Sequence, residues 1–135
     1  MFSKIELRSG YQQLQIKEDD IPKTDFKTIF RHYVFTILPF GLTNAPGVFM
    51  SLMNRLFREY LDKFIQVFID DILIYSRTME EHDEHFCLVL QCLREHKLYG
   101  KLSKFSFQSK IHYLGNVIYD EGIIVYPAKV EAIME

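Results

Sequence analysis

Two adjacent aspartates interrupt the most apolar, strand-like stretch of the chain. Asp70 and Asp71 separate the run FIQVFI at 64–69 from the run ILIY at 72–75. Asp is depleted in strands and neighbouring carboxylates repel each other, so the pair is unfavourable between two apolar strands. A two-residue hairpin loop would more often contain Asn-Gly or Asp-Gly. The pattern predicts a β-hairpin carrying two carboxylates, which is either a plain turn or a divalent-metal site.

The metal interpretation depends on the chemistry of the carboxylate group. Its oxygens are hard ligands that suit Mg²⁺, which binds through one or two carboxylates together with waters and substrate phosphates. A metal site for phosphoryl transfer ordinarily needs a further carboxylate from another element. Glu6 ends the strand-like run FSKIEL at 2–7 and is the candidate, although a solvent-facing strand residue is the ordinary interpretation of such a Glu.

Strand patterns recur along the rest of the chain and are joined mainly by short connections. The further candidate strands lie at 25–30, 32–38, 111–119 and 123–126. The polar segment at 17–24 is expected to be a loop. Strands and helices interleave through hairpins rather than through regular βαβ units, so the pattern favours the α+β class.

Two segments have the apolar spacing of amphipathic helices. The first follows Asn44, a candidate N-cap, and its apolar stripe runs from Val48 to Tyr60. The second opens with Thr78 and Glu81, which have the spacing of a capping box, and is expected to end near His96. The residues expected to face inward on this second helix are Phe86, Val89, Leu90 and Leu93.

Three histidines, His82, His85 and His96, lie on or near the second helix. A His pair at i and i+3 can bind zinc, but no third ligand is convincingly spaced and no HExxH motif occurs. A solvated, charged helix face is therefore the preferred interpretation.

Composition excludes several classes of protein. A length of 135 residues with 48% hydrophobic and 25% charged residues is typical of one globular domain rather than a disordered chain. The net charge of −2 is weak for a free-standing nucleic-acid binder. Cys87 and Cys92 are too few for a disulfide framework and are expected to be free, buried thiols. No leader or membrane-spanning run is visible, and the strand-like start is expected of a piece of a larger protein.

Several motifs together resemble the reverse transcriptase of LTR retrotransposons of the gypsy class. The four most specific are LPFGLTNAP at 38–46, FIDDILIYS at 68–76, REHKLY at 94–99 and YLG at 113–115. Three more occur in the same order, namely FSKIELRSGYQQ at 2–13, IPKT at 21–24 and EEH at 80–82. The resemblance covers nearly the whole chain and implies a polymerase palm-type antiparallel sheet packed on helices, with part of the fingers and without the thumb. It implies a fingers-like hairpin region at 12–37, with 1–11 and 38–135 mainly palm.

The resemblance also implies a reaction, the template-directed addition of a deoxynucleotide to a primer 3′ hydroxyl. Two Mg²⁺ ions, with Mn²⁺ as a substitute, would be held by Glu6, Asp70 and Asp71. The implied partners are an RNA or DNA template with its primer, deoxynucleoside triphosphates and the rest of a Pol polyprotein (thumb, RNase H and integrase), but no membrane. The implied location is a cytoplasmic virus-like particle or the nucleus.

Further residues match the family's substrate-binding positions. Tyr11 matches the aromatic that excludes a ribose 2′ hydroxyl, although a half-buried core aromatic is its ordinary interpretation. Phe40 and Gly41 match nucleotide-binding positions, and either Lys101 or Lys104 matches the basic residue near the triphosphate. The spacing does not decide between these lysines, and a solvated lysine is the alternative.

Template and primer contacts are implied at a second set of residues. These are Asn44, Ala45, Pro46 and Phe68, and then Tyr113, Leu114 and Gly115 of a primer-grip hairpin. Without the resemblance, Asn44 reads as a helix cap and the last three as an ordinary strand with a glycine bulge.

One departure from the family pattern bears on activity. Glu6 stands where the family has Asp, and its extra methylene moves the carboxylate by roughly an ångström, a misplacement that can cost about 10²-fold in rate. We therefore expect weak or no catalysis, and no detectable primer extension from the isolated chain. The alternatives are a decayed or domesticated palm remnant that only binds nucleic acid or protein, and a generic two-metal phosphotransferase or nuclease.

Overall fold

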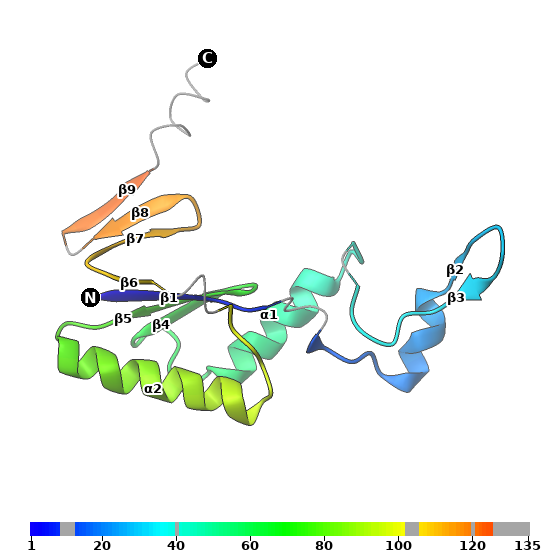
Figure 1. Ribbon diagram of the computed structural model, residues 1–135, viewed down its shortest axis with the longest axis horizontal. Helices are drawn as coiled ribbons and strands as arrows, with labels where there is room; N and C mark the ends of the chain where they lie inside the picture. Colours follow the sequence, from blue (N-terminus) through cyan, green and yellow to red (C-terminus); the bar gives the residue numbers. More distant parts are fainter. Residues whose placement is uncertain (9–12, 40, 102–105, 120, 126–135) are drawn as a thin grey trace, which may run out of the picture.

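The computed structural model describes residues 1–8, 13–39, 41–101, 106–119 and 121–125. These residues form stacked layers of sheet and helix at one end of the molecule and a smaller hairpin region at the other (Figure 1). None of the helices within these ranges combines the length and apolar character needed to cross a membrane.

The central layer is a four-stranded antiparallel sheet with the strand order β4-β5-β1-β6. Its strands are β1 (Phe2–Glu6), β4 (Ile65–Phe68), β5 (Asp71–Tyr75) and β6 (Ser106–Gln108). The predicted hairpin at 64–75 is confirmed, but Asp71 is the first residue of β5, so only Ile69 and Asp70 form the loop. The pairing of β1 beside β5 joins segments that are far apart in sequence.

Alternation along β1 and β5 separates an apolar face from a charged one. Ile5, Ile72 and Ile74 are fully buried on one face, because successive strand side chains point to opposite sides. Lys4, Glu6 and Asp71 are only half-buried on the other. The apolar face therefore forms the main core, and the charged face carries the candidate site.

Two helices complete the main core. They are α1 (Ala45–Leu56) and α2 (Met79–Glu95), and their buried Phe49, Met53, Val89 and Leu93 join the same cluster as the sheet residues. The predicted capping box of α2 is confirmed, since Thr78 Oγ1 accepts a hydrogen bond of 3.2 Å from the Glu81 amide. Asn44 occupies the N-cap position of α1, but its side chain makes no capping hydrogen bond.

Three details of the helix predictions are wrong. The first helix ends at Leu56 rather than at Tyr60, although the following Phe57 is buried. Leu90 is exposed because the buried stripe passes through Val89, Cys92 and Leu93, which places Leu90 off that face. The prediction of free thiols is confirmed, but only Cys92 is buried, and Cys87 is exposed.

A second, three-stranded sheet covers the charged side of the central sheet. It consists of β7 (Lys110–Tyr113), β8 (Asn116–Tyr119) and β9 (Gly122–Val125), where the sequence predicted one hairpin. Ile111 and Tyr113 pack against Leu73 of β5 in a second small core. Figure 1 shows this sheet on the opposite side of β1 and β5 from α2.

The hairpin region begins with a 3-10 helix, η2 (Glu18–Thr24), so the predicted loop at 17–24 is wrong. The Thr24 hydroxyl donates a hydrogen bond of 2.7 Å to the Ile21 carbonyl and accepts one of 2.8 Å from the Phe35 amide. The second bond connects this helix to the strands that follow. The predicted hairpin is present as β2 (Phe26–Lys27) and β3 (His32–Tyr33), with only two residue pairs.

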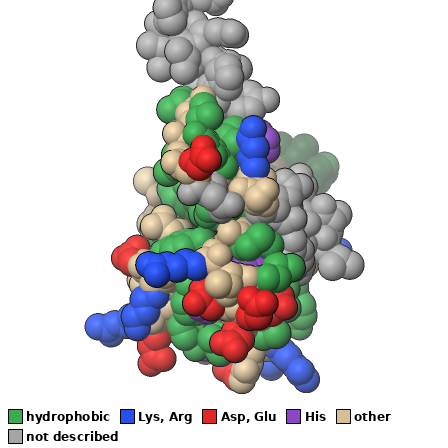
Figure 2. All heavy atoms as spheres, turned by 90° about the vertical axis from the view of Figure 1, so that its left-hand side faces the viewer, with side chains coloured by type: hydrophobic (Ala, Val, Ile, Leu, Met, Phe, Trp, Pro, Cys, Tyr) green, Lys and Arg blue, Asp and Glu red, His purple; other side chains and the backbone are tan. Residues whose placement is uncertain are grey.

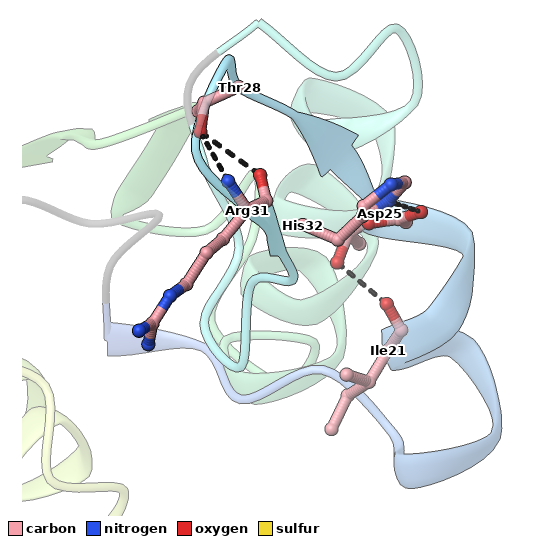
Figure 3. Close-up of polar contacts among 6 residues, drawn as sticks. Ile21, Asp25, Thr28, Arg31 and His32 are labelled. Carbon is pink, nitrogen blue, oxygen red and sulfur yellow. Dashed lines mark hydrogen bonds and ion pairs between the residues drawn. The ribbon is translucent and has the colours of Figure 1, made fainter.

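Side-chain hydrogen bonds reinforce this short hairpin. Thr28 bonds to Arg31 across the loop, and an ion pair of 3.1 Å joins Asp25 and His32 (Figure 3). Phe26 stacks on both Tyr33 and Phe35, yet all three rings stay well exposed. The hairpin therefore depends more on local contacts than on a core.

Candidate functional site

The antiparallel pairing of β1 with β5 brings the predicted carboxylates to one end of the sheet. Glu6, the last residue of β1, lies directly opposite Asp71, the first residue of β5. Asp70 immediately precedes Asp71 in the loop, and its carbonyl accepts a hydrogen bond of 2.8 Å from the Leu7 amide. Residues separated by more than sixty positions in the chain thus become direct neighbours.

The loop that carries Asp70 has an unusual backbone. Ile69 has a φ of 53° at the first central position of the two-residue loop between Phe68 and Asp71. Such loops need a positive φ there, but a β-branched residue rarely adopts it. The Ile69 amide donates a hydrogen bond of 2.8 Å to the sulfur of Met50, so a side chain of α1 stabilises this backbone conformation. The loop is therefore held by tertiary contacts rather than by a Gly or Asn.

Two lysines neutralise the facing carboxylates. Lys101 Nζ lies 2.5 Å from Glu6 Oε1, and Lys4 Nζ lies 3.2 Å from Asp71 Oδ1. Lys4 precedes Glu6 by two residues on β1, so both side chains project from the same face of the strand. Sequence spacing left Lys101 and Lys104 as equal candidates for a basic residue near this site, and the structure brings Lys101 to it. Lys104 lies outside the described residues.

The pKa shifts show how the groups influence one another. Burial raises the pKa of Asp71; the Lys4 ammonium opposes this shift, and the charges of Asp70 and Glu6 add to it. The hydrogen bond to Glu6 raises the pKa of Lys101, and the charges of Glu6, Asp70 and Asp71 contribute in the same direction. The Lys101 ammonium therefore lies in the field of all three carboxylates.

The predicted three-carboxylate metal site is not assembled with the side chains as they lie. Within the described ranges, no group of three or more His, Cys, Asp or Glu side chains is arranged to hold a metal ion. Lysines instead engage oxygens of Glu6 and Asp71. The donor set nevertheless suits a hard cation, because carboxylate oxygens are hard ligands and the charges of all three carboxylates act on one ammonium group. The residues fit Mg²⁺ by their chemistry, provided that a lysine moves aside.

Of the predicted primer-grip residues, Tyr113 lies close to this end of the sheet, against Leu73 of β5. Tyr113 is buried, and burial together with the charge of Asp71 raises the pKa of its hydroxyl. Leu114 and Gly115, at φ values of 50° and 72°, connect the paired residues Tyr113 and Asn116. A two-residue loop with two positive φ values is a tight hairpin turn, so the glycine-bulge alternative is wrong.

The remaining predicted residues divide into two groups. Gly41 has a φ of 95°, a conformation that favours glycine, while Ala45 is buried at the start of α1 and Pro46 occupies its first turn. Phe68 is half-exposed opposite Asp71. Tyr11, Phe40 and Lys104 lie outside the described residues.

A groove lies beside the start of α1, where template contacts were predicted. Its volume is about 960 Å³, and it runs between α1 and the segment from Leu14 to Thr24. Asn44 and Gly47 line it together with Lys17, Arg55 and Lys23, and Lys23 forms an ion pair of 2.6 Å with Asp20, which also lines the groove. The opposite end of the molecule, where the first turn of α2 carries Glu80 and Glu81, instead gathers acidic side chains (Figure 2).

A buried chain of polar side chains was missed by the sequence analysis. His82 is fully buried, and hydrogen bonds of 2.6 and 3.0 Å join it to Ser3 Oγ and Ser76 Oγ. Ser76 Oγ also bonds to His85 Nδ1 at 2.7 Å, and the His85 ring stacks on Phe64 with ring centroids 3.8 Å apart. The predicted solvated helix face is therefore wrong for His82. The missed signal is its spacing, since positions 82, 86, 89 and 93 form one helical stripe.

Comparison with known proteins agrees with this geometry. The family model described as "Reverse transcriptase (RNA-dependent DNA polymerase)" matches residues 1–118. The chain belongs to the reverse transcriptase family. The solved foamy viral protease-reverse transcriptase in complex with an RNA/DNA hybrid is similar to this family member, with a TM-score of 0.84 and 26% identity over 99% of the chain. The chain covers 18% of that structure, and the predicted α+β palm-type fold is confirmed.

Relatives of this reverse transcriptase sequence include Pol polyproteins of Drosophila melanogaster transposons. The chain is 39% identical to that of transposon opus over 135 residues and 35% identical to that of transposon gypsy, covering 14% and 13% of those proteins. It is also 44% identical over 99 residues to an RNA-directed DNA polymerase homolog of Oenothera berteroana and covers 67% of it. The resemblance to the gypsy class is confirmed, and the residue roles that it implies stay predictions.

Proposed function

We propose that this chain forms the catalytic palm of a retrotransposon RNA-directed DNA polymerase. The observation that carries the proposal is the register that sets Glu6 opposite Asp71, with Asp70 in the adjoining loop. The family is generally metal-dependent, and these carboxylates are the residues that would hold two Mg²⁺ ions. When bound, the ions would lower the pKa of the attacking primer hydroxyl and stabilise the charge of the triphosphate and its leaving group.

The other side chains would position the substrates. Tyr113 packs against Leu73 and lies in the field of the Asp71 charge, and the tight turn after it would hold the primer end there. The groove beside Asn44 is lined by Lys17 and Arg55 as well as by the Lys23–Asp20 ion pair, so its lining keeps a net positive charge that would attract a template backbone. Deoxynucleoside triphosphates and a template–primer duplex are therefore the proposed substrates. The fingers-like division at 12–37 stays part of the same proposal.

The proposal includes slow catalysis. Glu6 carries one methylene more than the family Asp, and its carboxylate is held by Lys101 rather than directed freely at a ligand. A metal coordinated in near-octahedral geometry tolerates such a displacement poorly. The same observation favours the second candidate function, a non-catalytic palm that only binds nucleic acid or protein.

Primer extension on an RNA template with Mg²⁺ tests both candidates. The chain and its Glu6→Asp and Asp70→Asn variants would each be measured alone and grafted into a full-length relative. In the graft, we expect Glu6→Asp to extend the primer about 10²-fold faster than Glu6, and Asp70→Asn to abolish extension. Equal extension rates for the graft with Glu6 and for its Glu6→Asp variant would contradict the proposal that Glu6 slows catalysis. Extension that survives Asp70→Asn would contradict the assignment of the site.

A further inference from the structure

We propose that Lys101 is a built-in counter-cation of the carboxylate site, which occupies the place of a divalent ion and has to leave before metal binds. The inference rests on the proposed function. Three features of the structure lead to it: how the main chain of Lys101 is held, how exposed its side chain is, and how the charges of the site balance.

The main chain around Lys101 is fastened along the end of β1. The Lys101 amide donates a hydrogen bond of 2.8 Å to the Glu6 carbonyl, and the Arg8 amide donates one of 2.7 Å to the Tyr99 carbonyl. Gly100 forms an isolated antiparallel bridge with Leu7 between these two contacts. Backbone contacts of Lys101 and of the two residues before it therefore hold this part of the chain against the end of β1 and place the ammonium beside Glu6.

The Lys101 side chain has a way out that does not disturb this backbone. It is 39% exposed, whereas the Glu6 side chain is 20% exposed. Lys4, the other lysine of the site, pairs with Asp71 and is only 22% exposed. A lysine whose stem is open to solvent can swing its charge into water, since each of its rotatable bonds moves independently of the main chain. Lys101 is therefore the cation that can be exchanged, and Lys4 is a fixed part of the site.

The charge balance gives the exchange a direction. Glu6, Asp70, Asp71, Lys4 and Lys101 together carry one net negative charge. When Lys101 turns away, the net charge becomes two negative, which a single divalent ion balances. Lys101 thus stabilises the site in the absence of metal and competes with the metal for the oxygens of Glu6.

Mn²⁺ binding to the purified chain tests this, with free Mn²⁺ followed by electron paramagnetic resonance. We expect Lys101→Met to bind Mn²⁺ about tenfold more tightly than the unmodified chain, because the competing charge is gone. Lys101→Arg keeps the charge and is expected to bind as weakly as Lys101. Lys63→Met, an exposed lysine at the other end of β4, is the matched control and is expected to change nothing. Circular dichroism checks the fold, and Lys101→Gln replaces the Met variant if the latter is unfolded.

Adding Asp70→Asn to each variant separates failure of the inference from failure of the proposed function. If Lys101→Met and the unmodified chain bind Mn²⁺ equally, and Asp70→Asn weakens both, the role of Lys101 is wrong and the carboxylate site stands. If no Mn²⁺ binding responds to Asp70→Asn, the metal site and the proposed function are both wrong. Tighter binding in Lys101→Met that Asp70→Asn removes supports both.

Discussion

At one end of the β1–β5 pair, Glu6 and Asp71 face lysines, and at the other end Ser3 and the nearby Ser76 bond to histidines. The first end is charged, half-buried and reachable from solvent. The second is built around the fully buried His82 and needs no charge to satisfy its hydrogen bonds. The same two strands thus carry a polar cluster that can exchange its cation and another that only holds the layers together.

The histidine end obeys a strict hydrogen-bond constraint. The Ser76 hydroxyl has one proton but lies within bonding distance of both His82 Nδ1 and His85 Nδ1. At least one of the two Nδ1 atoms must therefore donate, and an ordered chain of donors runs from helix to sheet. The carboxylate end has no comparable constraint, because water can replace a lysine there.

The largest expected effect on stability comes from removing the buried His82. Replacing His82 by Leu leaves the Ser3 hydroxyl without this partner in the core, and Ser76 loses one of its two ring contacts, so we expect a loss of about 2–3 kcal/mol in the free energy of unfolding. Urea denaturation measures the loss. The exposed His32→Leu serves as the control and is expected to cost far less. An equal loss at both positions would mean that the buried chain contributes nothing special.

The second prediction concerns pH. Burial lowers the pKa of His82, with the N-terminal ammonium and His85 acting in the same direction and Asp83 against it. The unfolded chain therefore binds this proton more readily, so stability is complete above the ordinary His pKa of about 6.5 and falls as the pH drops below it. The slope from this one group is at most about 1.4 kcal/mol per pH unit. Unfolding measured between pH 7.5 and 5 should show a shallower slope in His82→Gln; an unchanged slope would contradict the assignment.

A smaller effect is expected where α2 begins. Thr78 caps the helix that positions both histidines, and Thr78→Ala removes the bond to the Glu81 amide. We expect a loss of about 1 kcal/mol in thermal or urea unfolding. Ser51→Ala, an exposed change inside α1, is the control and is expected to be nearly neutral. If Thr78→Ala is equally neutral, the cap does not support the buried end.

The smallest expected effect, with the opposite sign, is at the carboxylate end. Burial raises the pKa of Asp71, so its charged form costs stability at neutral pH, and Lys4 offsets only part of that cost. Asp71→Asn should therefore increase the free energy of unfolding by about 0.5 kcal/mol at pH 7, and this gain should vanish below the ordinary Asp pKa. Asp19→Asn, an exposed change, should leave stability unaltered. A destabilised Asp71→Asn would show that the ion pair with Lys4 outweighs burial.

Local patterns predicted the elements whose signals are short-range. Alternation located β1 and the hairpin at 64–75, and the Thr78 and Glu81 spacing located the start of α2. The η2 helix was missed because its sequence is polar, and the predicted strand at 111–119 was not divided into β7 and β8 at Leu114 and Gly115. The η2 conformation depends on contacts such as that of Thr24 with Phe35, which lies beyond a local window.

By itself, the sequence determined the family, the α+β class and the identity of three carboxylates, because these follow from motifs and from residue chemistry. Only the tertiary structure decided that Glu6 faces Asp71, that Lys101 engages Glu6, and that His82 is buried against Ser3. The physical reason is that strand register and helix docking set these contacts across separations of 65, 95 and 79 residues. Charge and hydrogen-bonding capacity are properties of single residues, but whether a lysine or a serine satisfies them depends on the packing of the whole chain.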